Sequence, residues 1–309
     1  MRVSTNMIYD QGVRALQTQS AALLYTGQQI ATGRKILTPA DDPVASARAL
    51  DVTQSRSVNK QFTTNQGYAE DALKLVEGQL DGAGEIIQYA RERALAAGNP
   101  ALSDSDRQSI ATDLKAQFDA MLAIANTRDA NGDYLFAGYK SETAPFEKTI
   151  VTPTDPAVSP FASADYAGDQ GIRTMQVSSS RFMPVSFGGE TVFGSEGESV
   201  FAVIGKFVEA LESGADVSGA VSTALGGLDA SLDRVLTTRA QIGSQLVEVE
   251  QLGFIGSDLD LQYATTLSNL QDLDYNEAIS RLTQQQTYLQ AAQQSFLKTT
   301  GLSLFNYLS

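Results

Sequence analysis

The stretch LKLVEGQLDGAGEIIQYARERALAA (Leu73–Ala97) decides the fold of this 309-residue chain. Its apolar residues recur in steps of three and four, which is the spacing of a helix that buries one face. Alternating large and small side chains on that face let a second helix approach closely. The stripe consists of Leu73, Val76, Leu80, Ala83, Ile87, Ala90, Ala94 and Ala97. The sequence therefore predicts a long helix packed lengthwise against another helix.

This helix is expected to begin near Val44, because no proline occurs between that residue and Ala97. Unbroken, it would be roughly 80 Å long, although Gly78, Gly82 and Gly84 leave a kink or break open. The preceding TPADDP (Thr38–Pro43) contains two aspartates suited to cap a helix and a proline suited to its first turn. Adjacent carboxylates on a turn do not converge on one substrate atom. Capping is therefore favoured over catalysis or a cation site.

Both chain ends carry thin helical stripes in which an apolar residue recurs every seventh position. Such narrow stripes are marginal alone and require partners to bury them. The last six residues are unusually apolar for a chain end. We therefore predict an assembly interface at Leu16, Leu23, Ile30, Leu37, Leu282, Leu289, Phe296, Leu304, Phe305, Tyr307 and Leu308. In the isolated monomer, residues 1–40 and 265–309 are expected to be disordered and to fold on assembly.

The middle of the chain changes composition. RDANGDYLFAGY (Arg128–Tyr139) predicts a turn at Asn131-Gly132 that opens into a strand. Five of the eight prolines lie between residues 141 and 199, with scattered aromatic residues. Short strands are predicted within IRTMQVS (172–178) and MPVSFGG (183–189). Helix returns near Val200, and a proline-free helical run extends from Val221 to about Leu297.

These patterns predict a mainly α fold: an elongated rod of long antiparallel helices with paired amino- and carboxyl-terminal coiled-coil arms. Residues 1–40 and 265–309 are expected to form the terminal coiled-coil domain. Residues 41–140 and 200–264 are expected to form a helical rod domain, and residues 141–199 a small β-rich, surface-exposed insert.

Composition argues for a structural protein without cofactor or metal, and against an enzyme. The chain has no histidine and no cysteine, so imidazole bases, thiol nucleophiles and the usual zinc ligands are absent. Its net charge of −14 argues against a nucleic-acid partner. Residues 1–60 nevertheless hold seven Lys and Arg against four Asp and Glu. No apolar run reaches the roughly 20 residues of a membrane span, and no Sec-type leader is recognisable at the start of the sequence.

Three segments carry a resemblance to a known family: MRVSTNMIY (Met1–Tyr9), GQQIATGRKILTPADDPVASARAL (Gly27–Leu50) and the last 51 residues from Leu259. They resemble the flagellin superfamily and, within it, the hook-associated protein 3 family of hook–filament junction proteins. NGDYLFAGYKSETAPF (Asn131–Phe146) resembles the junction proteins more than filament flagellin. Asn276 departs from the alanine that the family commonly has in this position of its DLDYAEA-like run.

The resemblance implies a structural role at the junction between hook and filament, outside the cell. It implies contacts with copies of the same chain, with hook-associated protein 1 on the hook side and with flagellin on the filament side. It also implies type III export without a cleaved signal peptide, and an export chaperone that binds the carboxyl-terminal helix. Filament flagellin remains the main alternative, and a coiled-coil sensor or adhesin stalk is a third. The role of residues 141–199 stays open between binding, lateral contact and surface decoration.

Overall fold

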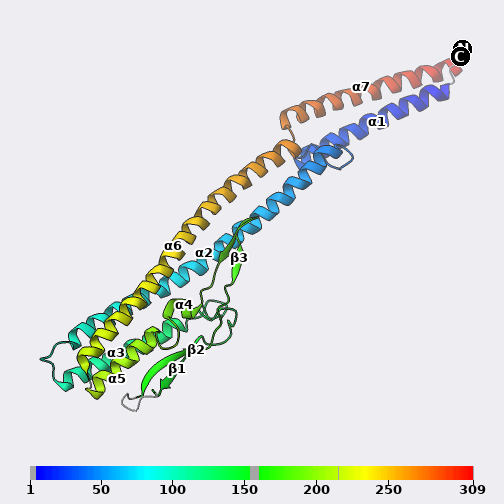
Figure 1. Ribbon diagram of the computed structural model, residues 1–309. Coiled ribbons are helices and arrows are strands. Elements are labelled where there is room, and N and C mark those ends of the chain that lie inside the picture. Colours follow the sequence, from blue (N-terminus) through cyan, green and yellow to red (C-terminus); the bar gives the residue numbers. More distant parts are fainter. Residues whose placement is uncertain (1–4, 154–159, 215, 309) are drawn as a thin grey trace. The chain divides into compact units, whose positions relative to one another are not determined.

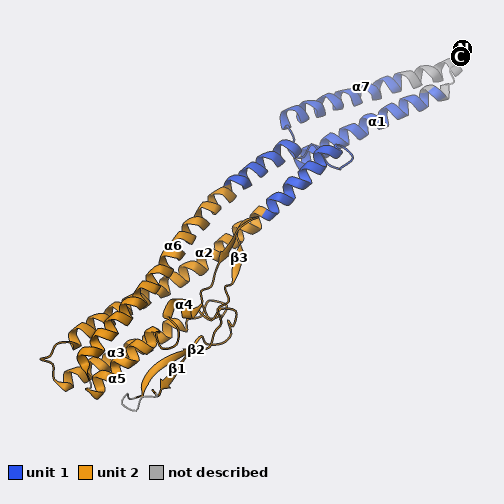
Figure 2. Ribbon diagram, in the orientation of Figure 1, with its two compact units in different colours: residues 1–58, 258–309 blue, residues 59–257 orange. Residues whose placement is uncertain are grey.

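The computed structural model describes the backbone of residues 5–153, 160–214 and 216–308. It describes the side chains of residue 7 and of residues 9–298 outside the same two gaps. The chain forms two compact units. Unit 1 consists of residues 1–58 and 258–309, and unit 2 of residues 59–257 (Figure 2).

Unit 1 is built from helices at both ends of the chain. It contains α1 (Thr5–Thr32), the start of α2 (Pro43–Ala97), the end of α6 (Val217–Gln271) and α7 (Tyr275–Leu308). Helices α1 and α7 lie side by side along their length (Figure 1). The predicted pairing of the two terminal arms is therefore confirmed.

Unit 2 combines the remaining lengths of α2 and α6 with α3 (Asp104–Ala125) and α5 (Val200–Ser213). Between α3 and α5 lie two antiparallel strand pairs and the short helix α4 (Gly189–Phe193). Strand β1 (Phe146–Val151) pairs with β2 (Phe161–Tyr166), and β3 (Thr174–Gln176) pairs with β4 (Phe182–Pro184). A mainly α fold with a small β-rich region, as predicted from the sequence, is confirmed.

The predicted stripe of α2 forms the centre of the unit 2 core. All eight of its residues, from Leu73 to Ala97, are at most 1% exposed. They pack with buried residues of α3, such as Leu114 and Met121, and of α6, such as Ile242. Helix α2 continues through Gly78, Gly82 and Gly84 without a break, because packing of the apolar face outweighs their low helix propensity.

A group of phenylalanines joins the β-rich segment to the helices of unit 2. The Phe201 ring of α5 lies 5.5 Å from Phe118 of α3, 5.1 Å from Phe146 of β1 and 6.0 Å from Phe193 of α4, measured between ring centroids. The ring of Phe136 lies 5.1 Å from that of Phe193. Aromatic rings at these separations attract one another beyond their burial alone. Residues 141–199 thus share the core of the helices.

Amide side chains of α2 fasten the β3–β4 hairpin to unit 2. Asn65 Nδ2 donates to the carbonyl of Gln176, and Gln66 Nε2 donates to that of Val177, both at 2.8 Å. Arg181 in the hairpin turn makes a two-pronged ion pair with Glu248 of α6, at 2.6 and 2.7 Å. The hairpin is therefore held to two different helices.

Two expectations about local structure are wrong. The turn at Asn131-Gly132 is present, but the strand predicted after it is replaced by isolated bridges at Tyr134 and Ala137. The main-chain hydrogen bonds of residues 134–137 go to separate segments, so they cannot form one strand ladder. Their partners include Ser141, Thr127 and Asp169. The helical run predicted from Val221 to Leu297 is interrupted between Gln271 and Tyr275. There the Asp274 carboxylate accepts hydrogen bonds from two backbone N–H groups and so caps α7.

The start of α3 gives a pH-dependent prediction. Ser103 and Asp106 form a capping box, and hydrogen bonds from the Ser103 hydroxyl and N–H lower the pKa of Asp106 below its ordinary value of 3.8. A lowered pKa stabilises the fold above pH 3.8, and this contribution is lost as the pH falls through the folded-state value. Asp106→Asn should therefore lower the urea midpoint more at pH 6 than near pH 2.5. Ser103→Ala should cost about 1 kcal/mol near pH 2.5, because the hydroxyl accepts the Asp106 N–H whatever the carboxyl charge, and more at pH 6, because its hydrogen bond to the carboxylate is also lost. An equal effect of Asp106→Asn at both pH values would contradict the account.

Candidate assembly interface

The predicted terminal stripes lie on α1 and α7, which pack against each other in unit 1. Leu16, Leu23 and Ile30 of α1 are half-buried, as are Leu282, Leu289 and Phe296 of α7; we call these six residues the α1–α7 seam. The rings of Tyr9 and Phe296 lie 5.3 Å apart, and Gly12 leaves room for the Phe296 ring. Half-burial is what a two-helix pair can give, since only one face of each helix is covered.

Two parts of the predicted interface lie elsewhere. Leu37 is half-buried in the connection between α1 and α2. The backbone of α7 extends to Leu308, but the side chains of Leu304, Phe305, Tyr307 and Leu308 lie outside the described residues.

Each terminal helix also has an exposed outer stripe that the sequence analysis missed. On α1 it consists of Gln17, Ala21, Leu24, Gln28 and Ala31, and on α7 of Ile279, Thr283, Gln286, Gln290, Gln293 and Leu297. Every member is exposed, including Leu24 at 67% and Ile279 at 52%. Both stripes follow the same steps of three and four as the seam. We call them the outer stripes of α1 and α7.

Apart from Ile279, the outer stripes lie in stretches without charge. No Asp, Glu, Lys or Arg occurs between Arg14 and Arg34, or between Arg281 and Lys298. Solvent-facing sides of helices usually carry charged residues. An uncharged side with apolar members is instead suited to contact with another protein surface. This lack of charge is the sequence signal that could have identified the outer stripes.

A main-chain clamp holds the two helix connections of unit 1 together. Lys35 N–H donates to the Gln271 carbonyl at 2.8 Å, and Leu273 N–H donates to the Gly33 carbonyl at 2.9 Å. Gly33 has a φ of +69°, and a side chain there would meet the Tyr275 hydroxyl. Only glycine adopts this conformation without strain. The clamp therefore fixes where α1 ends relative to the start of α7.

The two aspartates of TPADDP have separate structural roles. Asp42 Oδ1 accepts the Ala45 N–H at 2.9 Å and caps α2, as predicted. Asp41 Oδ2 instead accepts the N–H groups of Leu37 and Thr38. The hydrogen bond from Thr38 is the main cause that lowers the pKa of Asp41. Both carboxylates are thus occupied in holding the backbone.

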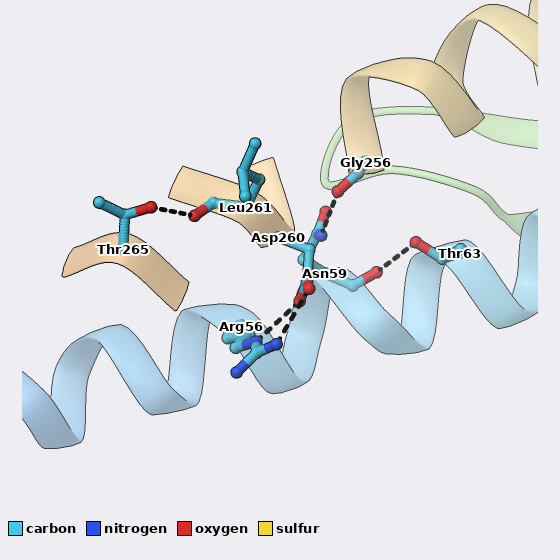
Figure 3. Close-up of polar contacts among 7 residues, drawn as sticks. All are labelled: Arg56, Asn59, Thr63, Gly256, Asp260, Leu261 and Thr265. Atoms are coloured by element: carbon cyan, nitrogen blue, oxygen red, sulfur yellow. Dashed lines mark hydrogen bonds and ion pairs between the residues drawn. The ribbon is translucent and has the colours of Figure 1, made fainter. Parts of the chain in front are cut away.

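Polar contacts also join α2 and α6 within each unit (Figure 3). In unit 1, Arg56 makes a two-pronged ion pair with Asp260 at 2.8 and 3.0 Å. Both side chains are more than 40% exposed, so the pair contributes little to stability. In unit 2, the buried Asn59 Nδ2 donates to the Gly256 carbonyl at 2.7 Å. This buried bond specifies the register of the two helices, because a shifted helix would leave the amide unpaired.

Among the described residues, no cluster of three or more Asp and Glu side chains is arranged to hold a metal ion. In the described part of the chain, none of the helices has the length and hydropathy that crossing a membrane requires.

Comparison with known proteins identifies close relatives over the whole length. Flagellar hook-associated protein 3 of Escherichia coli (strain K12) is 36% identical to this chain, with 99% of each covered. The protein of the same name from Salmonella typhimurium is 34% identical, again with 99% of each covered. The family described as the bacterial flagellin N-terminal helical region matches residues 3–141. Flagellin of Bacillus subtilis is 26% identical, over 47% of this chain and 48% of its own length.

Solved structures share the fold. A flagellar hook-associated protein from Vibrio parahaemolyticus matches with a TM-score of 0.67 at 22% identity, covering 75% of this chain and all of its own. The flagellar junction protein from Legionella pneumophila matches with a TM-score of 0.57 at 19% identity, covering 73% of this chain and all of its own.

Proposed function

Because the chain belongs to the flagellar hook-associated protein 3 family, we infer that it is a structural component of the bacterial flagellum and forms the junction between hook and filament. The observation that carries this conclusion is the match over 99% of both chains to two proteins of that name. The chain acts by packing against other flagellar subunits rather than by catalysis.

Filament flagellin is the second candidate, and the match of residues 3–141 to the flagellin N-terminal region favours it. That similarity covers less than half of the chain, whereas the junction proteins match throughout. Seeded polymerisation separates the two candidates. A flagellin extends filaments by itself, and a junction protein does not.

The interface in the flagellum comprises two layers of contact in unit 1. The α1–α7 seam, together with Leu37 and the apolar tail at Leu304, Phe305, Tyr307 and Leu308, forms the first layer. The outer stripes of α1 and α7 form the second layer and meet neighbouring subunits. Support comes from their exposure and from the absence of charge between Arg14 and Arg34 and between Arg281 and Lys298.

Residues 1–40 and 265–309 fold only on assembly. Within the described part of unit 1, the buried apolar side chains are Ala49, Leu273 and Ala278. Burial of so little apolar area cannot offset the conformational entropy lost on ordering long helices. Limited proteolysis of the monomer tests this proposal: the ends should be digested first and residues 59–257 should resist. Ends as resistant as unit 2 would contradict it.

The partners of the chain follow from its proposed position between hook and filament. They are further copies of the chain, hook-associated protein 1 on the hook side and flagellin on the filament side. The chain reaches the outside of the cell through the flagellar type III apparatus without a cleaved signal peptide. An export chaperone binds the carboxyl-terminal helix, α7, before secretion. Unfolded termini support this route, because an export channel passes extended chains.

A deletion strain tests the junction role directly. Electron microscopy should show hooks without filaments, with flagellin shed into the medium, and expression of the chain from a plasmid should restore filaments. Normal filaments on the deletion strain would contradict the proposal.

A further inference from the structure

Within unit 2, helix α6 has two apolar faces that point in different directions. The inner face, with Val235, Ile242 and Val249, is at most 2% exposed and belongs to the core. A second face is exposed, follows steps of three and four from Leu236 to Val247 and, beyond Glu250, continues at Phe254. It consists of Leu236, Ala240, Gly243, Val247 and Phe254, and we call it the outer stripe of α6. Leu236, Val247 and Phe254 are 46%, 54% and 65% exposed.

The lack of charge along most of this stripe is unusual for the surface of unit 2. The unit contains 14 Lys and Arg against 27 Asp and Glu, a net charge of −13. Yet the stripe has no charged member over about three turns from Leu236 to Val247, and only Glu250 interrupts it before Phe254. A seven-residue repeat of apolar and small side chains is the pattern that receives another helix lengthwise. The partner is therefore helical and has little charge where it touches.

Helix α2 has such a surface within the same unit. Gln61, Thr64 and Tyr68 are exposed, follow one another at steps of three and four, and carry no charge. Tyr68 is 62% exposed. We call these three residues the outer stripe of α2.

Opposite charges flank the two stripes. Lys60 precedes Thr64 by one turn, and Glu250 precedes Phe254 by one turn. Both are exposed, and neither belongs to an ion pair within the described residues. Two units of charge −13 repel each other, so they can approach only where both surfaces lack charge or carry opposite charges. The two outer stripes meet this requirement together.

We propose that the outer stripe of α6 in one copy of the chain docks on the outer stripe of α2 in a second copy. The proposal rests on the proposed function, because it assigns a lateral contact within the same assembly. Two different surfaces meet in this contact, so it is head-to-tail. In a pair of copies, one copy keeps a free α6 stripe and the other keeps a free α2 stripe. Such a contact continues from subunit to subunit instead of stopping at a dimer.

Site-specific cross-linking tests the proposal, since the natural chain has no cysteine. Two differently tagged versions, Thr64→Cys and Val247→Cys, are expressed together in a strain without its own copy. Isolated flagella are treated with a short bismaleimide. A covalent dimer carrying both tags is expected. The matched control uses Gln241→Cys in place of Val247→Cys. Gln241 is exposed on α6 but lies about 100° around the helix from Ala240, a member of the stripe. This control should give at least tenfold less of the mixed dimer.

The outcomes separate this proposal from the function on which it rests. Immunoblotting first establishes whether the tagged chains are present in the flagella, and their absence would count against the proposed function. With both chains present, lack of the mixed dimer would overturn the docking of α6 on α2. So would a dimer formed by Val247→Cys alone at equal yield, because it would mean that two α6 stripes meet each other.

Discussion

Replacing Phe201 by alanine is expected to lower the free energy of unfolding of unit 2 by about 3–5 kcal/mol. The ring is 0% exposed and contacts aromatic rings from α3, β1 and α4. Its removal leaves a cavity at the point where the β-rich segment meets the helices, and the surrounding core can refill it only in part. Urea unfolding followed by far-ultraviolet circular dichroism measures the change.

The matched control for this variant is Phe182→Ala. It removes the same side chain from strand β4, where the ring is 56% exposed. Its cost should stay within about 0.5 kcal/mol, as for most surface substitutions. If both variants lost similar stability, the aromatic group would not be the link between segment 141–199 and the helices.

Replacing Leu289 by aspartate is expected to abolish swimming while leaving unit 2 intact. Leu289 lies half-buried in the α1–α7 seam, where no basic side chain is near in sequence to pair with a new carboxylate. An unpaired charge at such a site costs about 1–3 kcal/mol or more, and each 1.4 kcal/mol reduces the population of the paired state about tenfold. Swimming in soft agar and the amount of chain in isolated flagella are the measurements.

Leu289→Met is the control for the seam, because it keeps an apolar side chain of similar volume and should cost less than about 1.5 kcal/mol. The urea midpoint of unit 2 should be the same for both variants, since Leu289 belongs to unit 1. Normal swimming of the aspartate variant would mean that the seam is dispensable for assembly.

The sequence predicted the parts of this fold that follow a helical repeat. The stripe from Leu73 to Ala97 is a local pattern, and burying it requires only a second helix with a similar stripe. The pairing of the terminal arms followed in the same way from Leu23 and Leu289. Capping at Asp42 was also predictable, because it depends on neighbours within three residues.

Features that depend on distant partners were not predictable. At the break before α7 the Leu273 N–H donates to the Gly33 carbonyl, and nothing in the local sequence indicates that partner, although the adjacent cap by Asp274 is local. The strand expected near Tyr134 failed for the same reason, since its main chain binds several separate segments. The outer stripes were missed for a different reason: glutamine and threonine in helical steps do not stand out by hydropathy, although their lack of charge is visible.

The main-chain clamp between Gly33 and Leu273 also constrains the order in which the protein can be completed. The two backbone segments that form the clamp come from opposite ends of the chain. A chain that emerges amino terminus first therefore makes α1 long before its partner α7 exists. Unit 2 can close as soon as residue 257 is available, whereas unit 1 must wait for almost the last residue. Closing so distant a contact is entropically costly and slow. The terminal unit is thus the last to form, which leaves its helices free for capture by another molecule in the meantime.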